Sequence, residues 1–362
     1  MLGNSKLINI IQFLKTKLKQ KLPRLAAMHL AWRDTGRKMQ IPQQEQQQVT
    51  IFSYDTSLAE DFNRVKPSCM NYYGNPCSVR KHMQEIWVSS SIHNAQKFAV
   101  MAHWDPHNRI DPYVKHYLSA LKKMGFATII ASQIEVIVEN DAEDYLDAAI
   151  WRTCSGYDFT SWKGALEYFP KILDSKELLL CNDSVFGPIK PLEPIHLSME
   201  ELNCDFWGMG ESNKHRTPHL FSFYLVFKQS ALRHDAFKNF WRRVDTNPDK
   251  TRVVTLYEIQ LSMQLMGQGL RGGTFFSYRD IPFLDETTYI YTHWRYLLNH
   301  AGFPFLKRDL VIPNRHPEAY PIEGWEDELT ASGYPAQLVI NYFSRIQSNE
   351  LFYPELKRMT DS

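Results

Sequence analysis

The sequence predicts an α/β protein whose core is a mainly parallel β-sheet flanked by helices. Three apolar runs, at residues 98–103, 126–132 and 177–181, have the length and composition of buried strands. Residues 113–124 and 159–168 lie between these runs and carry apolar side chains at helical spacing. Strands that alternate with helices in this way form βαβ units, which place their strands parallel in one sheet.

Composition excludes several classes of protein. The chain has 362 residues, of which 44% are hydrophobic and 22% charged, as in globular proteins. Its net charge is +1, so we expect no nucleic-acid partner, because dedicated nucleic-acid-binding proteins are usually strongly basic. No apolar run approaches the roughly 18 residues of a membrane-spanning helix. Five cysteines without metal-ligand spacing indicate reduced thiols and a cytoplasmic location.

The N-terminal region differs from the rest of the chain in charge. Residues 1–40 carry a net charge of +8, so the remainder carries −7. Apolar residues recur every three or four positions from Leu7 to Leu25, which predicts a basic amphipathic helix within residues 1–39. Such a helix either binds an anionic membrane surface or packs on the protein's own core. The first alternative would make the protein peripheral at the inner face of the cell membrane.

Polar clusters follow the predicted strands at 98–103 and 177–181 and a further short apolar run at 148–151, which we also expect to be a strand. They lie at residues 105–111, 152–158 and 182–184. Ligands of parallel sheets bind at the carboxyl ends of the strands, so we expect these clusters to converge there. The sequence contains no Gly-x-Gly-x-x-Gly, P-loop, Gly-x-Ser-x-Gly or His-Glu-x-x-His motif. This argues against a Rossmann dehydrogenase, a P-loop NTPase, an α/β-hydrolase and a zinc protease.

Further short motifs occur in a fixed order along the chain. They are AHWDP at 102–106, GYDF at 156–159, LLLCNDSVFGP at 178–188, DFWG at 205–208, YE at 257–258 and GFPFLKR at 302–308. Together they resemble the rhamnan synthesis protein F family, bacterial glycosyltransferases of cell-surface polysaccharide assembly, over roughly residues 98–315.

The resemblance implies a GT-A-like nucleotide-diphosphosugar transferase fold, a mixed sheet with helices on both faces. It also implies an inverting rhamnosyltransferase that uses a dTDP-L-rhamnose-like donor. The acceptor would be a growing polysaccharide, such as O-antigen or capsule, or a lipid-linked oligosaccharide. We therefore divide the chain into a helix region at 1–39, a glutamine-rich linker at 40–49, the N-terminal part of the folded body at 50–97, the GT-A-like domain at 98–315 and a helical C-terminal extension at 316–362.

Sugar transfer needs groups that hold the nucleotide and groups that stabilise the leaving diphosphate. The residues we expect to contact the donor are Asp105, Arg109, Arg152, Gly156, Asp158, Asn182, Asp183, Ser184, His219, Lys307 and Arg308. Asp183 stands at the position where GT-A enzymes hold a divalent metal, so the resemblance implies Mg²⁺ or Mn²⁺ bound there. Each polar cluster also has a structural alternative, because Asn, Asp and Ser are common helix caps.

The reaction also needs a base that accepts the proton of the acceptor hydroxyl. We expect Glu258 to be this base, at the end of a strand that runs directly into a helix. Asp205, beside aromatic residues, is the second candidate. Glu258 has the alternative role of an acid that stabilises a helix N-terminus. A catalytically silent binding or scaffold protein of a glycan-assembly complex stays open as an alternative function.

Overall fold

The computed structural model describes residues 76–213, 218–280, 284, 288–312 and 322–347, together with the backbone of β1 (Thr50–Ile51). The chain divides into two units, Met1–Gln47 and Gln48–Ser362, and all described residues belong to the second unit. The predicted helix region at 1–39 and the linker before residue 50 lie outside the described residues and stay predictions.

Strands and helices alternate along the first half of the described chain. The other strands are β2 (Met83–Val88), β3 (Lys97–His103), β4 (Ala127–Ser132), β5 (Ala148–Arg152), β6 (Glu177–Asn182), β7 (Val185–Phe186), β8 (Phe206–Ser212), β9 (His219–Leu220), β10 (Tyr224–Lys228), β11 (Gly272–Phe276) and β12 (Leu306–Lys307). The helices are α3 (Pro112–Lys123), α4 (Asp158–Tyr168), α5 (Glu193–Glu201), α6 (Gln229–Arg233), α7 (Asp235–Arg243), α8 (Lys250–Val253), α9 (Ile259–Gly267), α10 (Tyr289–Thr292), α11 (Trp294–Tyr296), α12 (Arg308–Val311), α13 (Trp325–Ala331) and α14 (Gln337–Gln347).

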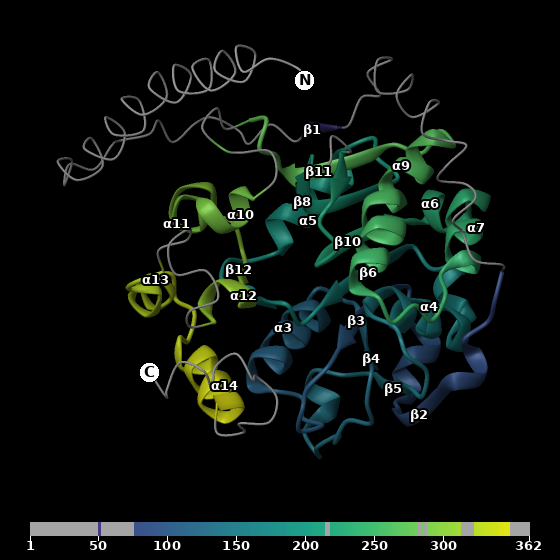
Figure 1. Ribbon diagram of the computed structural model, residues 1–362, viewed down its shortest axis with the longest axis horizontal. Coiled ribbons are helices and arrows are strands. Elements are labelled where there is room, and N and C mark those ends of the chain that lie inside the picture. Colours follow the sequence, from purple (N-terminus) through teal and green to yellow (C-terminus); the bar gives the residue numbers. More distant parts are fainter. Residues whose placement is uncertain are drawn as a thin grey trace, which may run out of the picture. The chain divides into compact units, whose positions relative to one another are not determined.

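A mixed sheet forms the centre of this unit, with the strand order β1-β11-β8-β10-β6-β3-β4-β5-β2 (Figure 1). Strands β6, β3, β4 and β5 are parallel, as the βαβ pattern predicts. Strand β10 is antiparallel to both β6 and β8, and β11 is parallel to β8. The prediction of a mixed α/β fold is therefore confirmed.

Helices cover both faces of the sheet because its strands are apolar on both sides. In β3, Ala99 and Met101 join one buried cluster, which includes side chains of α3, α5 and α14. Phe98 and Val100 join a second cluster, which includes side chains of α4, α6, α7 and α9. Side chains that point alternately to two covered faces are typical of a strand buried inside an α/β sheet.

The segment before Glu258 differs from the prediction. Residues Val254–Glu258 form a π-helical turn, labelled η6, and not a strand. Their β-branched residues suggest a strand, but the carboxylate of Asp249 caps a helix that begins at Lys250, accepting from the Thr251 amide at 2.8 Å. Single π-helical turns inserted in α-helices occur often at functional sites.

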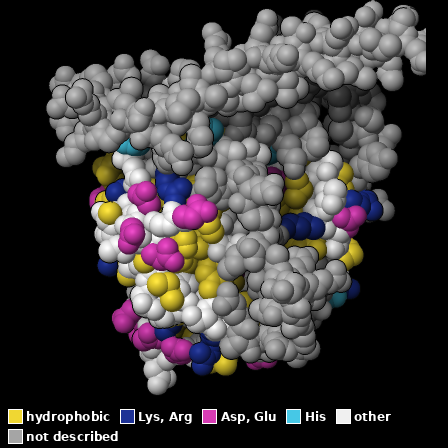
Figure 2. Space-filling view, turned by 60° about the vertical axis from the view of Figure 1, so that its left-hand side comes forward, with side chains coloured by type: hydrophobic (Ala, Val, Ile, Leu, Met, Phe, Trp, Pro, Cys, Tyr) yellow, Lys and Arg dark blue, Asp and Glu magenta, His cyan; other side chains and the backbone are white. Residues whose placement is uncertain are grey.

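The described surface mixes charged and apolar side chains. Figure 2 shows one face, on which acidic, basic and hydrophobic side chains are interspersed. In the part of the chain that the structure describes, no helix has the length and apolar composition needed to cross a lipid bilayer.

Candidate functional site

The polar segments after β3, β5 and β6 lie at one edge of the sheet. Because these strands and β4 are parallel, with Ala102 beside Asn182 and Ser132 beside Trp151, their carboxyl ends meet there. Strand β8 runs in the same direction as β6, since β10 is antiparallel to both. The convergence predicted from the sequence is present, and we call this region the carboxyl edge.

Residues Asn182, Asp183 and Ser184 form the turn between β6 and β7. The side-chain oxygen of Asn182 accepts hydrogen bonds from the Ser184 hydroxyl at 2.6 Å and from its amide at 3.2 Å. The amide group of Asn182 donates to Asp158 Oδ2 at 2.8 Å. Asn182 therefore connects this turn to the first residue of α4.

Lys307 and Arg308 reach the same turn from the second half of the chain. Strand β12 pairs with β7, which places Lys307 opposite Val185. The Arg308 amide donates to the Ser184 carbonyl at 2.8 Å, and Lys307 Nζ donates to Ser184 Oγ at 3.0 Å. Gly187 permits this close approach, because its φ is 149° and a Cβ there would lie 2.6 Å from the Pro304 carbonyl oxygen.

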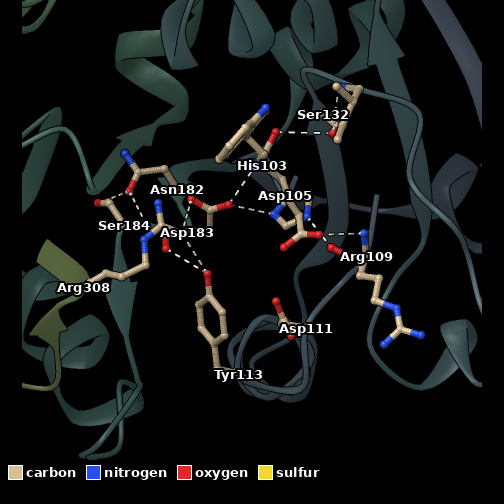
Figure 3. A network of polar contacts seen from close by, with 12 residues as sticks. His103, Asp105, Arg109, Asp111, Tyr113, Ser132, Asn182, Asp183, Ser184 and Arg308 are labelled. Atoms are coloured by element: carbon tan, nitrogen blue, oxygen red, sulfur yellow. Dashed lines mark hydrogen bonds and ion pairs between the residues drawn. The ribbon is translucent and has the colours of Figure 1, made fainter. Parts of the chain in front are cut away.

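Asp183 lies between two basic side chains (Figure 3). Its Oδ1 is 3.2 Å from Arg308 Nη1, and its Oδ2 is 2.8 Å from His103 Nδ1. Oδ2 also accepts a hydrogen bond from the Trp104 amide at 3.0 Å. Burial would raise the pKa of Asp183, but the charge of Arg308 and the contact with His103 lower it overall. Asp183 is therefore a carboxylate, and both of its oxygens have partners.

His103 contributes positive charge to this pairing. Its Nε2 lies 2.9 Å from the Arg109 carbonyl oxygen, which can only accept, and its Nδ1 faces the Asp183 carboxylate. Burial would lower the pKa of His103, but the hydrogen bond and charge of Asp183 raise it overall. The sequence analysis did not predict His103 as a site residue, although its position at the end of an apolar strand, next to the polar cluster at 105–111, could have indicated it.

Asp158 begins α4 and faces the other carboxylates of the site. Burial, with the negative charges of Asp183 and Glu258, raises the pKa of Asp158 to about 6, even though the Asn182 amide opposes this shift. Near neutral pH, a small change in its surroundings therefore changes the charge of Asp158. Asp158 can accept hydrogen bonds at this position, and it also supplies a negative charge at the start of the helix.

Arg152 and Gly156 shape the loop that precedes Asp158. The Arg152 guanidinium, buried at 3% exposure, donates to Ser161 Oγ at 2.9 Å, to the Gly156 carbonyl at 2.7 Å and to the Cys154 carbonyl. Gly156 has a φ of 133°, and a Cβ there would lie 2.3 Å from Thr160 Oγ1. Arg152 therefore holds this loop in place, and these three hydrogen bonds occupy its guanidinium.

Glu258 reaches the site from the π-helical turn η6. Its Oε1 accepts a hydrogen bond from the Ser222 amide at 3.2 Å. Ser222 lies just before β10, whose first residue Tyr224 pairs with Cys181 of β6, so this contact places Glu258 at the carboxyl edge. Its charge acts on both Asp158 and Lys307. Burial lowers the pKa of Lys307 to about 8, although the negative charges of Asp309, Glu258 and Asp158 act in the opposite direction.

The side chains of Asp105 and Arg109 make no direct contact with Asp183 within the described residues. Asp105 is 1% exposed; it accepts from the amides of His107 and Arg109 at 2.9 and 3.1 Å and pairs with Arg345 of α14. The Arg109 side chain is exposed and points away from Asp183 (Figure 3). The pairing with Arg345 carried no sequence signal, because α14 follows Asp105 by more than two hundred residues.

Asp205 lies at the opposite edge of the sheet, just before β8. Its carboxylate accepts from Ser230 Oγ at 2.7 Å and from the Arg271 amide at 2.8 Å. The structure therefore separates the two predicted bases and leaves Glu258 at the site. His219, by contrast, opens β9 opposite Ser212 at the carboxyl edge, and it is 4% exposed.

A divalent metal bound by Asp183 does not fit these residues. Both oxygens of Asp183 already face basic or N–H groups: Arg308 Nη1 lies 3.2 Å from Oδ1, while His103 Nδ1 and the Trp104 amide contact Oδ2. Asp158 accepts from the Asn182 amide. Within the described ranges, no group of three His, Cys, Asp or Glu side chains is arranged to hold a metal ion.

The fold and the clustered charges define an α/β protein with a group of charged side chains at the carboxyl edge of its sheet. The family model of rhamnan synthesis protein F matches residues 127–361, and the chain belongs to this family. The family predicted from the short motifs is thereby confirmed. Membership of this family supports the prediction that the chain is a glycosyltransferase.

Individual relatives show more distant similarity. The chain is 27% identical to the virulence protein VirA of Vibrio anguillarum in an alignment of 226 positions, which covers 54% of this chain and 72% of that protein. It is 30% identical over 161 residues to the uncharacterized protein y4gN of Sinorhizobium fredii, covering 42% of each chain.

Solved structures with similar regions include a glycosyltransferase and a putative sugar transferase. One is the glycosyltransferase GlyE of Streptococcus pneumoniae TIGR4, with 11% identity, coverage of 69% of this chain and 64% of that chain, and a TM-score of 0.34. The other is a putative nucleotide-diphospho-sugar transferase of Desulfovibrio desulfuricans G20, with 11% identity, coverage of 66% and 97%, and a TM-score of 0.31. Because both TM-scores are below 0.5, the fold assignment comes from the strand order of this chain.

Proposed function

We propose that this protein is an inverting glycosyltransferase with a GT-A-like fold, which transfers rhamnose from a dTDP-L-rhamnose-like donor. The acceptor would be a growing cell-surface polysaccharide or a lipid-linked oligosaccharide. The observation that carries the proposal is the meeting of Asp158, Asp183, Glu258, Lys307 and Arg308 at one carboxyl edge, in a member of the rhamnan synthesis protein F family.

The donor would lie along the turn between β6 and β7. Asp158, fixed by Asn182 and positioned by the Gly156 loop, supplies an acceptor for hydroxyl groups of the nucleoside. Lys307 and Arg308 supply positive charge for the diphosphate on the other side of Ser184. A nucleotide sugar carries both hydroxyl groups and a diphosphate, and side chains suited to each contact the turn between β6 and β7.

The transfer step would be a single displacement. The acceptor hydroxyl oxygen forms a bond to the anomeric carbon while the bond from that carbon to the diphosphate oxygen breaks. Glu258 accepts the hydroxyl proton, and the electron pair of the broken bond leaves with the diphosphate. Attack from the face opposite the leaving group inverts the anomeric configuration. Lys307 and Arg308 stabilise the charge that develops on the diphosphate.

We further propose that the protein works at the inner face of the cell membrane. The net charge of +8 in residues 1–40 suits attraction to anionic lipid headgroups, where a lipid-linked acceptor would be held. This part of the proposal rests on sequence alone.

The proposal is tested by Glu258→Gln in the full chain, with transfer from a panel of nucleotide sugars to a lipid-linked acceptor as the readout. We expect kcat to fall by about 10²- to 10⁴-fold, because the amide cannot accept the proton, while the donor KM changes little. Glu143→Gln, on an exposed residue, is the matched control and should keep full activity. Full activity of Glu258→Gln would contradict the role of this residue as the base. If the unmodified chain bound the donor but transferred no sugar, a binding or scaffold protein would be favoured instead.

A further inference from the structure

We propose that Lys307 and Arg308 neutralise the donor diphosphate in place of a divalent metal, an inference that rests on the proposed function. The disagreement between the expected metal site and the residues present motivates it. GT-A-like enzymes place a carboxylate-held cation against the diphosphate, whereas here the carboxylate of Asp183 faces a guanidinium.

Metal binding at Asp183 would have to disrupt several existing contacts. Arg308 Nη1 lies 3.2 Å from one carboxylate oxygen, and the other oxygen contacts His103 Nδ1 at 2.8 Å and the Trp104 amide at 3.0 Å. Asp183 is 6% exposed, so each displaced group would lose its partner inside the protein. A cation that approached Asp183 would also meet two basic side chains at short range.

Arg308 is anchored through one end of its guanidinium. Its Nη1 contacts Asp183 and donates to the Tyr113 hydroxyl at 3.0 Å. Within the described residues, its Nη2 and Nε make no hydrogen bond, so donors of the planar group stay available to phosphate oxygens. Asp183 thus acts as a positioning residue that holds Arg308 in one orientation.

Lys307 supplies the second charge from the neighbouring position. Its Nζ donates to the neutral hydroxyl of Ser184, and no ion pair joins it to a carboxylate within the described part of the chain. Pairing of β12 with β7 fixes the backbone of this residue beside the turn that follows β6. A half-buried ammonium with a neutral partner is suited to binding an anionic ligand.

The test is calorimetric titration of the chelator-treated full chain with dTDP, UDP and GDP, first in EDTA and then with Mg²⁺ or Mn²⁺. We expect at least one nucleoside diphosphate to bind with the same affinity in both conditions. Lys307→Met should weaken this binding by about tenfold to a hundredfold, the loss expected for one charge-assisted hydrogen bond, and Lys307→Arg should restore part of it. Lys176→Met, on an exposed lysine at the opposite edge of the sheet, is the matched control and should bind normally.

Thermal unfolding of each variant shows that the chain is folded before titration. Binding that requires the metal would overturn the inference and leave the proposed function intact. Equal affinity of Lys307→Met and the unmodified chain would also overturn it. If no nucleoside diphosphate binds in either condition, the proposed function fails, and this inference fails with it.

Discussion

Lys307 provides a prediction about pH at the scale of a single residue. Burial lowers its pKa to about 8 from an ordinary value of 10.5, so its ammonium loses its proton as the pH rises through about 8. A diphosphate is already fully ionised in this range. We therefore expect the affinity for a nucleoside diphosphate to fall by up to about tenfold per pH unit above pH 8, measured by calorimetry.

Lys307→Met separates this effect from other titrating groups. The variant has no charge to lose, so its weaker affinity should stay constant over the same pH range. A decline in affinity above pH 8 that persists in Lys307→Met would assign the titration to another group.

Individual site residues were predicted where a local pattern marks them. Asn182, Asp183 and Ser184 follow a run of buried leucines, and a polar triplet at the end of such a strand must lie at a sheet edge. The structure brings them together with Asp158, Glu258 and Lys307, while their roles in binding and catalysis stay predictions. Asp205 has an equally polar local pattern, and only the direction of β8 shows that it lies at the other edge.

At the scale of elements, the short pair β7 and β12 determines where both proposed cations lie. Gly187 follows β7 with a φ of 149°, and a Cβ there would lie 2.6 Å from both the Pro304 carbonyl oxygen and the Phe305 ring. We expect Gly187→Ala to reduce the free energy of unfolding by about 1–3 kcal/mol through strain and overlap. Because β12 must shift, nucleoside diphosphate affinity should fall as far as in Lys307→Met, measured by calorimetry.

Gly125→Ala is the control for backbone strain alone. Gly125 has a φ of 83°, but a Cβ there would have no neighbour within 4 Å. It precedes β4 and lies away from the carboxyl edge. This variant should lose some stability and keep its affinity. An unchanged affinity in Gly187→Ala would show that the β7 and β12 pair does not position the diphosphate site.

Elements were predictable to different degrees for physical reasons. Strands β3, β4 and β6 are recognisable because both of their faces are apolar, which leaves few alternatives to a buried strand. The antiparallel insertion of β10 between β6 and β8 depends on long-range pairing and has no local pattern. The helical turn before Glu258 was predicted as a strand, because its β-branched residues favour strands while the cap at Asp249 acts from outside the segment.

At the scale of the second unit, one face of the C-terminal helix α14 packs against α3 and the buried cluster on that side of the sheet. Val339, Tyr342 and Ile346 join the same buried cluster as the side chains of α3, and the Tyr342 ring lies 5.2 Å from that of Tyr113. The sequence predicts a helix here but not where it packs, because the residues it contacts, in α3 and the loop after β3, are more than two hundred positions away. This helix belongs to the predicted C-terminal extension, and through Arg345 it holds the loop that follows β3.

Arg345 provides the corresponding prediction for the stability of this unit. It pairs with Asp105 and Asp111, which are 1% and 6% exposed, with Nη1 to Asp105 Oδ1 and Nε to Asp111 Oδ1 both at 3.2 Å. Arg345→Met would leave two carboxylates buried without their cation. We expect the free energy of unfolding at neutral pH, measured by chemical denaturation, to fall by about 3 kcal/mol or more.

The pH dependence of this loss identifies its cause. Burial would raise the pKa of Asp105, but hydrogen bonds from Arg345 and the loop amides lower it below the ordinary 3.8. Asp105 therefore stabilises the folded state above pH 3.8, and this contribution is lost as the pH falls. Without Arg345 the pKa of both carboxyls should rise, and protonation should relieve the penalty in acid. The difference in stability between the unmodified chain and Arg345→Met should therefore be largest near neutral pH and shrink towards about pH 4. Arg233→Met, on an exposed arginine of α6, is the control and should not change the free energy of unfolding at any pH. If the loss of stability in Arg345→Met did not vary with pH, Arg345 would stabilise the unit through packing and not through its charge.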